Sequence, residues 1–306
     1  MNILFMASQW RFWQHFTPVI STLAASGHAV TAAIPGADPD GATTGNMAVK
    51  LLTAGATIRV RPGREHPGPW TKRILTPPPD AILLCPDHLD PMRRIKPILA
   101  ERHANPPPVI TMQHGLSQAF GPDTENWTDH YLCWGLLGAH ICQTTHRLKN
   151  AVFVTGTPRF DAMTPAKTED KGFILAHAGH VDGRGGRCNA AYLRRLLNAC
   201  PGDRPIIVKI HPNDRDFPTP PPLGRITFVS HKIHPLELLR TCHALYLDYP
   251  STCWLEARHF GKPVICDAQA AFLKKMQLEN ALAATGPEAT QNIINAIIQT
   301  VERKAP

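Results

Sequence analysis

The sequence is poor in charged residues and lacks the paired cysteines of a zinc site. Asp, Glu, Lys and Arg make up 18% of its 306 residues, compared with roughly 25% in an average soluble protein. Its 8 cysteines include no C-x-x-C pair, and several lie within apolar runs, where a small buried side chain fits. The histidines show no H-E-x-x-H spacing. We therefore expect neither a disulfide scaffold nor a bound metal.

The sequence also lacks a hydrophobic run long enough to span a membrane. Residues 12–37 contain no charged residue, but Pro18, Gly27 and His28 interrupt them, which indicates strand, helix and strand rather than a signal peptide or membrane span. No other stretch approaches 18 consecutive apolar residues. The sequence therefore predicts a cytoplasmic protein, and it leaves open an attachment to the surface of an anionic membrane.

The charge that is present has an excess of one sign. Lys and Arg number 32 against 24 Asp and Glu, which gives a net charge of +8. This excess favours anionic ligands, including phosphate-bearing small molecules. The basic residues are dispersed, and no run of Lys or Arg alternates with aromatic residues. Nucleic acid is therefore not expected as a partner.

Short apolar runs alternate with helical patterns in both halves of the chain, which predicts a parallel sheet in each half. The run Ile3–Ala7, a helical segment ending at Gly27 and the run Ala29–Ile34 form a first βαβ unit. In the first half, further strands are expected at 57–60, 81–85 and 109–112, with a helix ending at Gly55. In the second half, strands are expected at 173–176, 205–210, 225–229, 244–247 and 263–266, with helices at 191–199, 235–241 and 253–260.

The length of the chain agrees with two domains, at roughly 150 residues each. The segment 158–171, with two prolines and mixed charge, is the natural linker. The predicted fold class is therefore α/β, with two Rossmann-like parallel-sheet domains, residues 1–165 and 166–306, facing a cleft.

Ligands of such sheets bind where strands end at their carboxyl edge. Gln113, His114 and Gly115 directly follow the strand 109–112, and the glycine would let another molecule approach the backbone closely. His114 is therefore a candidate for chemistry. A hydrogen-bonded structural histidine is the alternative.

A second group of candidates follows the strand 205–210. Pro212 ends the strand directly after His211, so the imidazole is expected to project from the edge of the sheet. Lys209 adds a cation two residues earlier, and together the two side chains can donate to phosphate oxygens. An ordinary strand end with a solvated lysine is the alternative.

Two further turns carry candidate ligand-binding residues. Asp248 begins the connection from the strand 244–247 to the next helix, where Ser251 or Thr252 can cap the helix and also face an anion. In the turn that ends the first half, Arg159 can hold a phosphate or pair with Asp161.

The order of these motifs resembles the GT-B superfamily of nucleotide-activated transferases. His-Gly, Thr-Gly-x-Pro-Arg-x-Asp, Lys-x-His-Pro and Asp-Tyr-x-Ser follow one another and precede Glu-Ala and Gly-Lys-Pro-Val-Ile, over about Val109 to Ile265. The sequence is most similar to the CDP-glycerol glycerophosphotransferases of teichoic acid synthesis and to related capsule glycosyltransferases. It departs from them at Leu116 and Ser117, where those enzymes have Thr-Pro, and at Pro250, which interrupts their Asp-Tyr-Ser-Ser motif.

The resemblance implies an acceptor-binding first domain and a donor-binding second domain. Positive side chains and a helix N-terminus can stabilise a nucleotide leaving group without a metal, so a metal-independent transfer is expected. The donor would be linked to CDP, CMP or UDP, and the acceptor would be a hydroxyl of a cell-surface glycan or a lipid-linked molecule. No cofactor besides the donor substrate is implied. A histidine suits proton removal from the hydroxyl near neutral pH. The implied roles are catalytic base for His114, phosphate binding for Lys209, His211, Ser251 and Thr252, and further contacts for Gln113, Gly115, Arg159, Asp248 and Glu256.

Two other functions stay open on the sequence alone. A UDP-sugar 2-epimerase-like enzyme would need carboxylates beside the sugar, for which Asp87, Asp123 and Glu125 are candidates without distinctive spacing. The second open function is that of a non-catalytic protein that binds nucleotide sugars. Release of the nucleotide from a panel of donors would distinguish the three.

Overall fold

The chain forms two compact units, one of residues 1–162 with 280–306 and one of residues 163–279. The structure is a computed structural model that describes residues 1–7, 10–34, 42–61, 66–85, 94–113, 128–145, 152–161, 163, 168–177, 190–210, 221–230, 232–248, 251–266 and 288–303.

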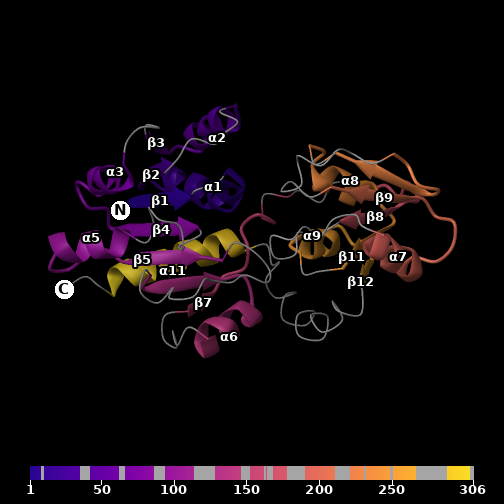
Figure 1. Cartoon of the computed structure of the whole chain (residues 1–306). Helices are drawn as coiled ribbons and strands as arrows, with labels where there is room; N and C mark the ends of the chain where they lie inside the picture. Colours follow the sequence, from indigo (N-terminus) through magenta and orange to yellow (C-terminus); the bar gives the residue numbers. More distant parts are fainter. Residues whose placement is uncertain are drawn as a thin grey trace. The chain divides into compact units, whose positions relative to one another are not determined.

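The first unit contains a sheet of seven parallel strands (Figure 1). Its strands are β1 (Asn2–Ala7), β2 (Ala29–Ile34), β3 (Thr57–Val60), β4 (Ala81–Cys85), β5 (Val109–Met112), β6 (His130–Cys133) and β7 (Val152–Val154). Their order is β3-β2-β1-β4-β5-β6-β7. The order reverses between β1 and β4, as in a doubly wound sheet.

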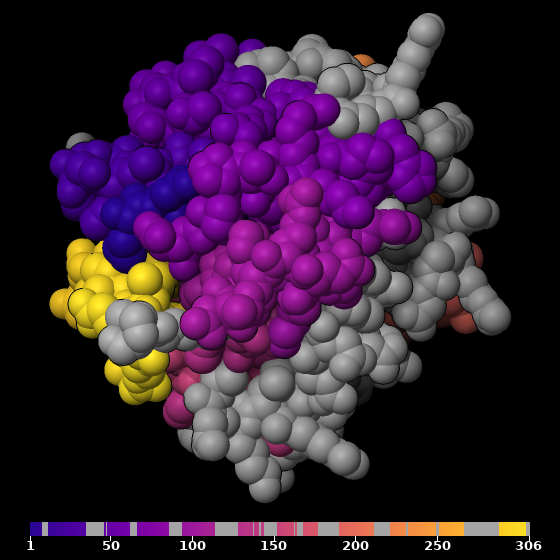
Figure 2. Space-filling model, turned by 90° about the vertical axis from the view of Figure 1, so that its left-hand side faces the viewer, coloured from indigo at the N-terminus to yellow at the C-terminus, as the bar shows by residue number. Residues whose placement is uncertain are grey.

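Helices cover both faces of this sheet. They are α1 (Trp10–Ala25), α2 (Ala42–Thr53), α3 (Pro67–Ile74), α5 (Ile95–Arg102), α6 (Leu136–Thr145) and α11 (Ala289–Glu302). Alternate residues of β1 point to opposite faces. Ile3 and Phe5 belong to the core under α1, α2 and α11, and Leu4 and Met6 to the core under α3 and α5. Figure 2 shows the side of this unit that carries α3 and α5 in violet and purple, with α11 in yellow.

The C-terminal helix α11 belongs to the first unit, whereas residues 166–306 were all expected in the second domain. Ile293 and Ile297 are fully buried in the same apolar cluster as Phe5 and Ile20, and α11 packs against α1. The predicted domain assignment is therefore wrong for residues 280–306. The apolar stripe of α11 is buried against α1 and the first sheet.

The second unit contains a smaller parallel sheet of five strands. Its strands are β8 (Ile174–His177), β9 (Ile206–Lys209), β10 (Ile226–Val229), β11 (Ala244–Leu247) and β12 (Val264–Cys266), and its helices are α7 (Ala190–Ala199), α8 (Pro235–Thr241) and α9 (Cys253–His259). The order is β10-β9-β8-β11-β12, which reverses between β8 and β11. Tyr192, Leu196, Ile206 and Tyr246 are buried in its core.

The predicted α/β class with parallel sheets is confirmed. Strands β2, β3, β4, β5 and β11 have the bounds that the sequence predicted, and so does α8. Within the described residues, no helix is both long and apolar enough to cross a membrane. The cysteines that the structure describes as free thiols are buried: Cys85, Cys133, Cys142, Cys200, Cys242 and Cys253.

Candidate functional site

The strand order of the second sheet places its reversal between β8 and β11, where doubly wound sheets bind ligands. Asp248 directly follows β11, and its side chain is 9% exposed. One carboxylate oxygen lies 3.1 Å from the Nη2 of Arg195 on α7 and accepts a hydrogen bond from it. This ion pair neutralises the charge of Asp248, so an anionic donor would not meet an uncompensated carboxylate there.

Lys209 is a buried cation at the carboxyl end of β9. Its exposed fraction is 1%, and its Nζ donates to the carbonyl oxygen of Ile210 at 3.1 Å. Burial lowers the pKa of the ammonium, and the nearby Cys253 thiol opposes that shift. The structure thus excludes the solvated lysine that the sequence left as an alternative. Because Cys253 is the first residue of α9, Lys209 lies beside the start of that helix.

The turn before α9 carries two hydroxyl groups with different surroundings. The Oγ of Ser251 accepts a hydrogen bond from the Cys253 N–H at 3.3 Å. Thr252 occupies the N-cap position, but its side chain makes no capping bond. The Ser251 hydroxyl therefore supports the turn, while the Thr252 hydroxyl is not used to cap α9.

Glu256 lies further along α9 and is 1% exposed, so its side chain is enclosed within the second unit. Glu256 is one of the residues that the sequence analysis names as possible contacts for the donor or the acceptor.

In the first unit, Gln113 links the ends of two neighbouring strands. Its backbone N–H donates to Leu132 at 2.9 Å, and its side-chain carbonyl oxygen accepts from the Trp134 N–H at 2.8 Å. The side chain is 3% exposed. Gln113 therefore fixes the backbone immediately before His114. His114 and Gly115 themselves lie outside the described residues, as does His211.

A buried histidine that the sequence analysis did not single out lies at the same edge of the first sheet. His15 comes from α1 and is 3% exposed. Its Nδ1 lies 3.2 Å from the Thr157 hydroxyl oxygen, and its ring centroid lies 5.2 Å from that of Trp134. The available signal was a histidine beside Trp13 and Phe16 on the apolar side of a helix.

The turn that contains Arg159 follows β7 and contacts the start of the C-terminal helix α11. Gly156 adopts φ +82°, a left-handed conformation that glycine favours. Asp161 accepts a hydrogen bond from the backbone N–H of Thr290 at 2.6 Å, in the first turn of α11. Arg159, which lies between Gly156 and Asp161 in the sequence, is half-buried. Asp161 thus stabilises the start of α11, a role that only the tertiary structure shows.

The structure brings expected residues together in the second unit and places one of them, Gln113, in a cluster of the first unit. In the second unit, Lys209 interacts electrostatically with Cys253, which directly follows Ser251 and Thr252 in the chain. Asp248 ends β11, which strand β8 separates from β9. In the first unit, Gln113 lies at the carboxyl edge in a cluster completed by Trp134, His15 and Thr157.

Neither a protein-family model nor a curated protein matches this sequence. Solved structures do match over nearly the whole chain. The UDP-GlcNAc 2-epimerase of Neisseria meningitidis, bound to UDP-GlcNAc, aligns with a TM-score of 0.62 and 12% identity over 98% of this chain and 100% of that chain.

Two further solved structures align over nearly the whole chain. HepE of Anabaena in complex with UDP aligns with a TM-score of 0.55 and 11% identity over 99% of this chain and 98% of that one. The spinosyn rhamnosyltransferase SpnG with thymidine diphosphate aligns with a TM-score of 0.51 and 14% identity, over 99% of this chain and 95% of that one. At these identities the likeness establishes the fold alone: the chain has the GT-B-like α/β fold that these epimerase and glycosyltransferase structures share.

Proposed function

We propose that this protein is a metal-independent transferase of GT-B type. It moves a glycosyl or polyol-phosphate group from a CDP-, CMP- or UDP-linked donor to a hydroxyl of a glycan or lipid-linked acceptor. The observation that carries the proposal is the buried ammonium of Lys209, beside the hydroxyl-bearing turn at the carboxyl edge of the second sheet. A buried cation at such an edge is well suited to phosphate oxygens.

In this proposal, the second unit binds the donor. Lys209, His211 and Thr252 stabilise the negative charge that develops on the departing nucleotide, and Ser251 supports the turn that carries Thr252. Charge-assisted hydrogen bonds of this kind are stronger in a site shielded from water. The GT-B-like neighbours include structures solved with UDP and with thymidine diphosphate, which supports a nucleotide ligand for this fold.

In the first unit, His114 is proposed as the catalytic base. It accepts the proton from the acceptor hydroxyl, the hydroxyl oxygen bonds to the transferred carbon or phosphorus, and the bond from that atom to the nucleotide breaks. Gln113 fixes the chain just before His114 through its hydrogen bonds to Leu132 and Trp134. A backbone held by hydrogen bonds immediately before His114 is what a positioned base requires.

A metal-free reaction is part of the proposal and needs its own test. The sequence contains two Asp-x-Asp triplets, residues 38–40 and 214–216, and both lie outside the described residues. Carboxylates at this spacing can hold a divalent ion. Turnover that survives a chelator would support the metal-free transfer, and turnover that needs added magnesium or manganese would overturn it.

A second candidate function is a UDP-sugar 2-epimerase-like reaction. The fold aligns with UDP-GlcNAc 2-epimerase structures at a TM-score of 0.62, compared with 0.50 to 0.55 for the glycosyltransferases and HepE. Its candidate carboxylates, Asp87, Asp123 and Glu125, lie outside the described residues.

The two functions are separated by following nucleotide and sugar together. The protein is incubated with UDP-GlcNAc, UDP-glucose and CDP-glycerol, with and without hydroxyl acceptors. Release of the nucleotide that depends on the acceptor supports transfer, whereas a sugar inverted at C2 without an acceptor supports epimerisation. Binding of the donor without either product would leave a nucleotide-sugar-binding protein, and no binding of any donor would overturn all three.

A further inference from the structure

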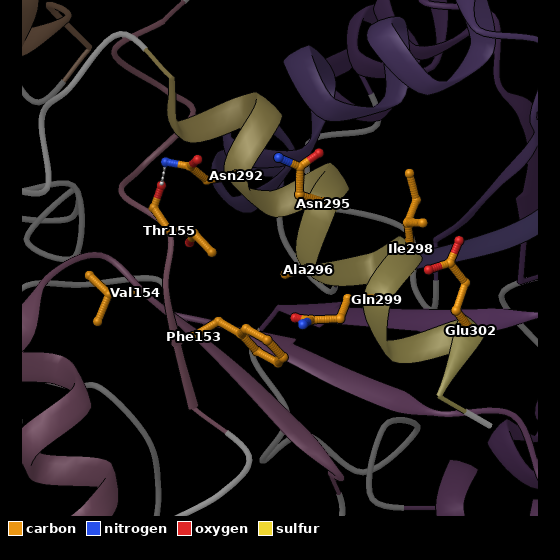
Figure 3. A pocket seen from close by; sticks show the side chains of 9 residues that line it. All are labelled: Phe153, Val154, Thr155, Asn292, Asn295, Ala296, Ile298, Gln299 and Glu302. Carbon is orange, nitrogen blue, oxygen red and sulfur yellow. Dashed lines mark hydrogen bonds between the residues drawn. The ribbon is translucent and has the colours of Figure 1, made fainter.

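A groove of about 500 Å³ lies between strand β7 and helix α11 of the first unit (Figure 3). Strand β7 is the last strand of the seven-stranded sheet. The groove is lined by Phe153, Val154, Thr155, Asn292, Asn295, Ala296, Ile298, Gln299 and Glu302. Its volume falls within the roughly 300–1,000 Å³ typical of small-molecule sites. The proposed function uses none of these residues.

Helix α11 contributes a row of polar side chains to the groove. Asn292, Asn295 and Gln299 are spaced by three and four residues and therefore share one face of the helix. Glu302 continues the row by another three residues. At a rise of 1.5 Å per residue, the row from Asn292 to Glu302 extends over roughly 15 Å. This length suits an extended ligand better than a single small ion.

Two hydrogen bonds orient the amides of this row. The Nδ2 of Asn292 donates to the carbonyl oxygen of Thr155 at 3.4 Å, which connects the helix to the chain after β7. The Oδ1 of Asn295 accepts from the Nε2 of Gln291 at 2.9 Å. The Nδ2 of Asn295 is then the side of that amide that can donate to a ligand.

The strand contributes an aromatic ring to the opposite wall. Phe153 is half-buried against the core of the first unit, and its ring centroid lies 5.9 Å from that of His130. In Figure 3 the ring and the amide of Gln299 point toward one another. An aromatic face thus lies opposite hydrogen-bonding amides.

The aromatic ring and the row of amides favour one chemical class of ligand. The described lining contains the carboxylate of Glu302 and no Lys or Arg, so it disfavours a phosphate. An apolar ligand would leave the amides without hydrogen-bond partners. A neutral sugar offers hydroxyls to the amides and a face of C–H groups to the electron-rich face of the ring.

We propose that the groove between β7 and α11 binds a neutral oligosaccharide. The groove shares no residue with the cluster of Gln113, Trp134 and His15, and its occupation requires neither a donor nor turnover. The proposal therefore goes beyond the proposed transfer reaction, and binding can be measured on a protein that proves to have no transferase activity.

The test is binding of defined neutral sugars to the full chain. Maltotetraose, cellotetraose and chitotetraose are titrated in saturation-transfer NMR and calorimetry, with uridine and inorganic phosphate as comparison probes. We expect at least one tetrasaccharide to bind with a dissociation constant of about 1 mM or below. Absence of saccharide binding at about 10 mM, or tighter binding of uridine or phosphate than of every saccharide, overturns the proposal.

Matched variants then locate the binding site. Asn295→Ala combined with Gln299→Ala should weaken the bound saccharide at least about tenfold, because two neutral hydrogen bonds are lost. Both side chains are exposed, so the fold should be retained. Gln299→Trp, which fills the groove, should also weaken binding. Asn198→Ala removes an exposed amide from α7 of the other unit and should leave affinity unchanged. Equal binding by the double variant and the wild type overturns the assignment.

Discussion

Replacement of Lys209 by methionine tests the proposed donor site most directly. The substitution removes the ammonium group and keeps an unbranched, flexible apolar side chain in a position that is 1% exposed. If the ammonium binds donor phosphates, the variant loses a charge-assisted hydrogen bond. Such a bond is worth about 1.5–3 kcal/mol, which corresponds to roughly 10- to 150-fold weaker nucleotide binding.

Although Lys209→Met should weaken nucleotide binding, it should not lower the free energy of unfolding. Burial lowers the pKa of Lys209 from 10.5, so the folded state disfavours the charged form. Replacing a buried charge by an apolar side chain is often neutral or stabilising. We therefore expect Lys209→Met to unfold at the same or a higher denaturant concentration than the wild type, while it binds nucleotide less tightly.

The lowered pKa also predicts how stability changes with pH. Between the lowered folded-state pKa and the ordinary lysine value, the unfolded chain binds more protons at this position than the folded chain. The Lys209 contribution to the free energy of unfolding therefore rises with pH across that window. Lys209→Met should lack this rise, which comparison of urea denaturation curves at several alkaline pH values would detect.

The measurements are calorimetric titration with UDP and CDP, and urea denaturation of the same preparations. Lys232→Met is the matched control, because Lys232 is an exposed lysine of the same unit. Nucleotide affinity unchanged in Lys209→Met would refute the phosphate-binding role. Unfolding at much lower urea would instead show that the ammonium stabilises the fold through Ile210.

The remaining predictions concern the other proposed residues and the position of α11. His114→Ala should lower kcat by about 10²–10⁴-fold with donor affinity nearly intact, and near-normal turnover in folded His114→Asn would exclude the base role. His211→Ala should weaken nucleotide binding in calorimetry as well as turnover, so unchanged affinity would contradict its assignment. Turnover should survive excess EDTA. Ile297→Ala should lower the free energy of unfolding in urea by about 2–5 kcal/mol, because Ile297 is fully buried, and a loss below about 0.5 kcal/mol would contradict the packing of α11.

Much of the sheet could be predicted from apolar runs and the turns that bound them. Buried parallel strands are apolar on both faces, so Ala81–Cys85 and Val109–Met112 appear as short uninterrupted runs between prolines or polar residues. Gly27 and Gly55, with φ +82° and +89°, end the first two helices where the sequence indicated.

Other elements carried weaker local signals. Helix α3 begins with Pro67 and contains Pro69, which resembles a loop in sequence, although proline is well tolerated in a first helical turn. The His66 side chain caps this helix by accepting from the Gly68 N–H. Strand β6 begins with His130, which shortens its apolar run, and strand β7 has only three residues.

The candidate site, like the fold, could be predicted from the sequence only in part. Positions after strands identified Gln113, Lys209 and Asp248, because parallel strands end at one edge of the sheet. The environments of these side chains did not follow from position. Asp248 is paired with Arg195, 53 residues earlier in the chain, and Gln113 bonds to Trp134.

The sequence by itself determined the parallel α/β class, most strand positions and the residues at the strand ends, since these depend on local patterns of apolar residues and turns. Only the tertiary structure decided which strands are neighbours and that α11 completes the first unit. It also decided that Lys209 is buried and that His15 meets Thr157 and Trp134. These features depend on which apolar surfaces cover one another, and that choice is made between segments that are distant in the sequence.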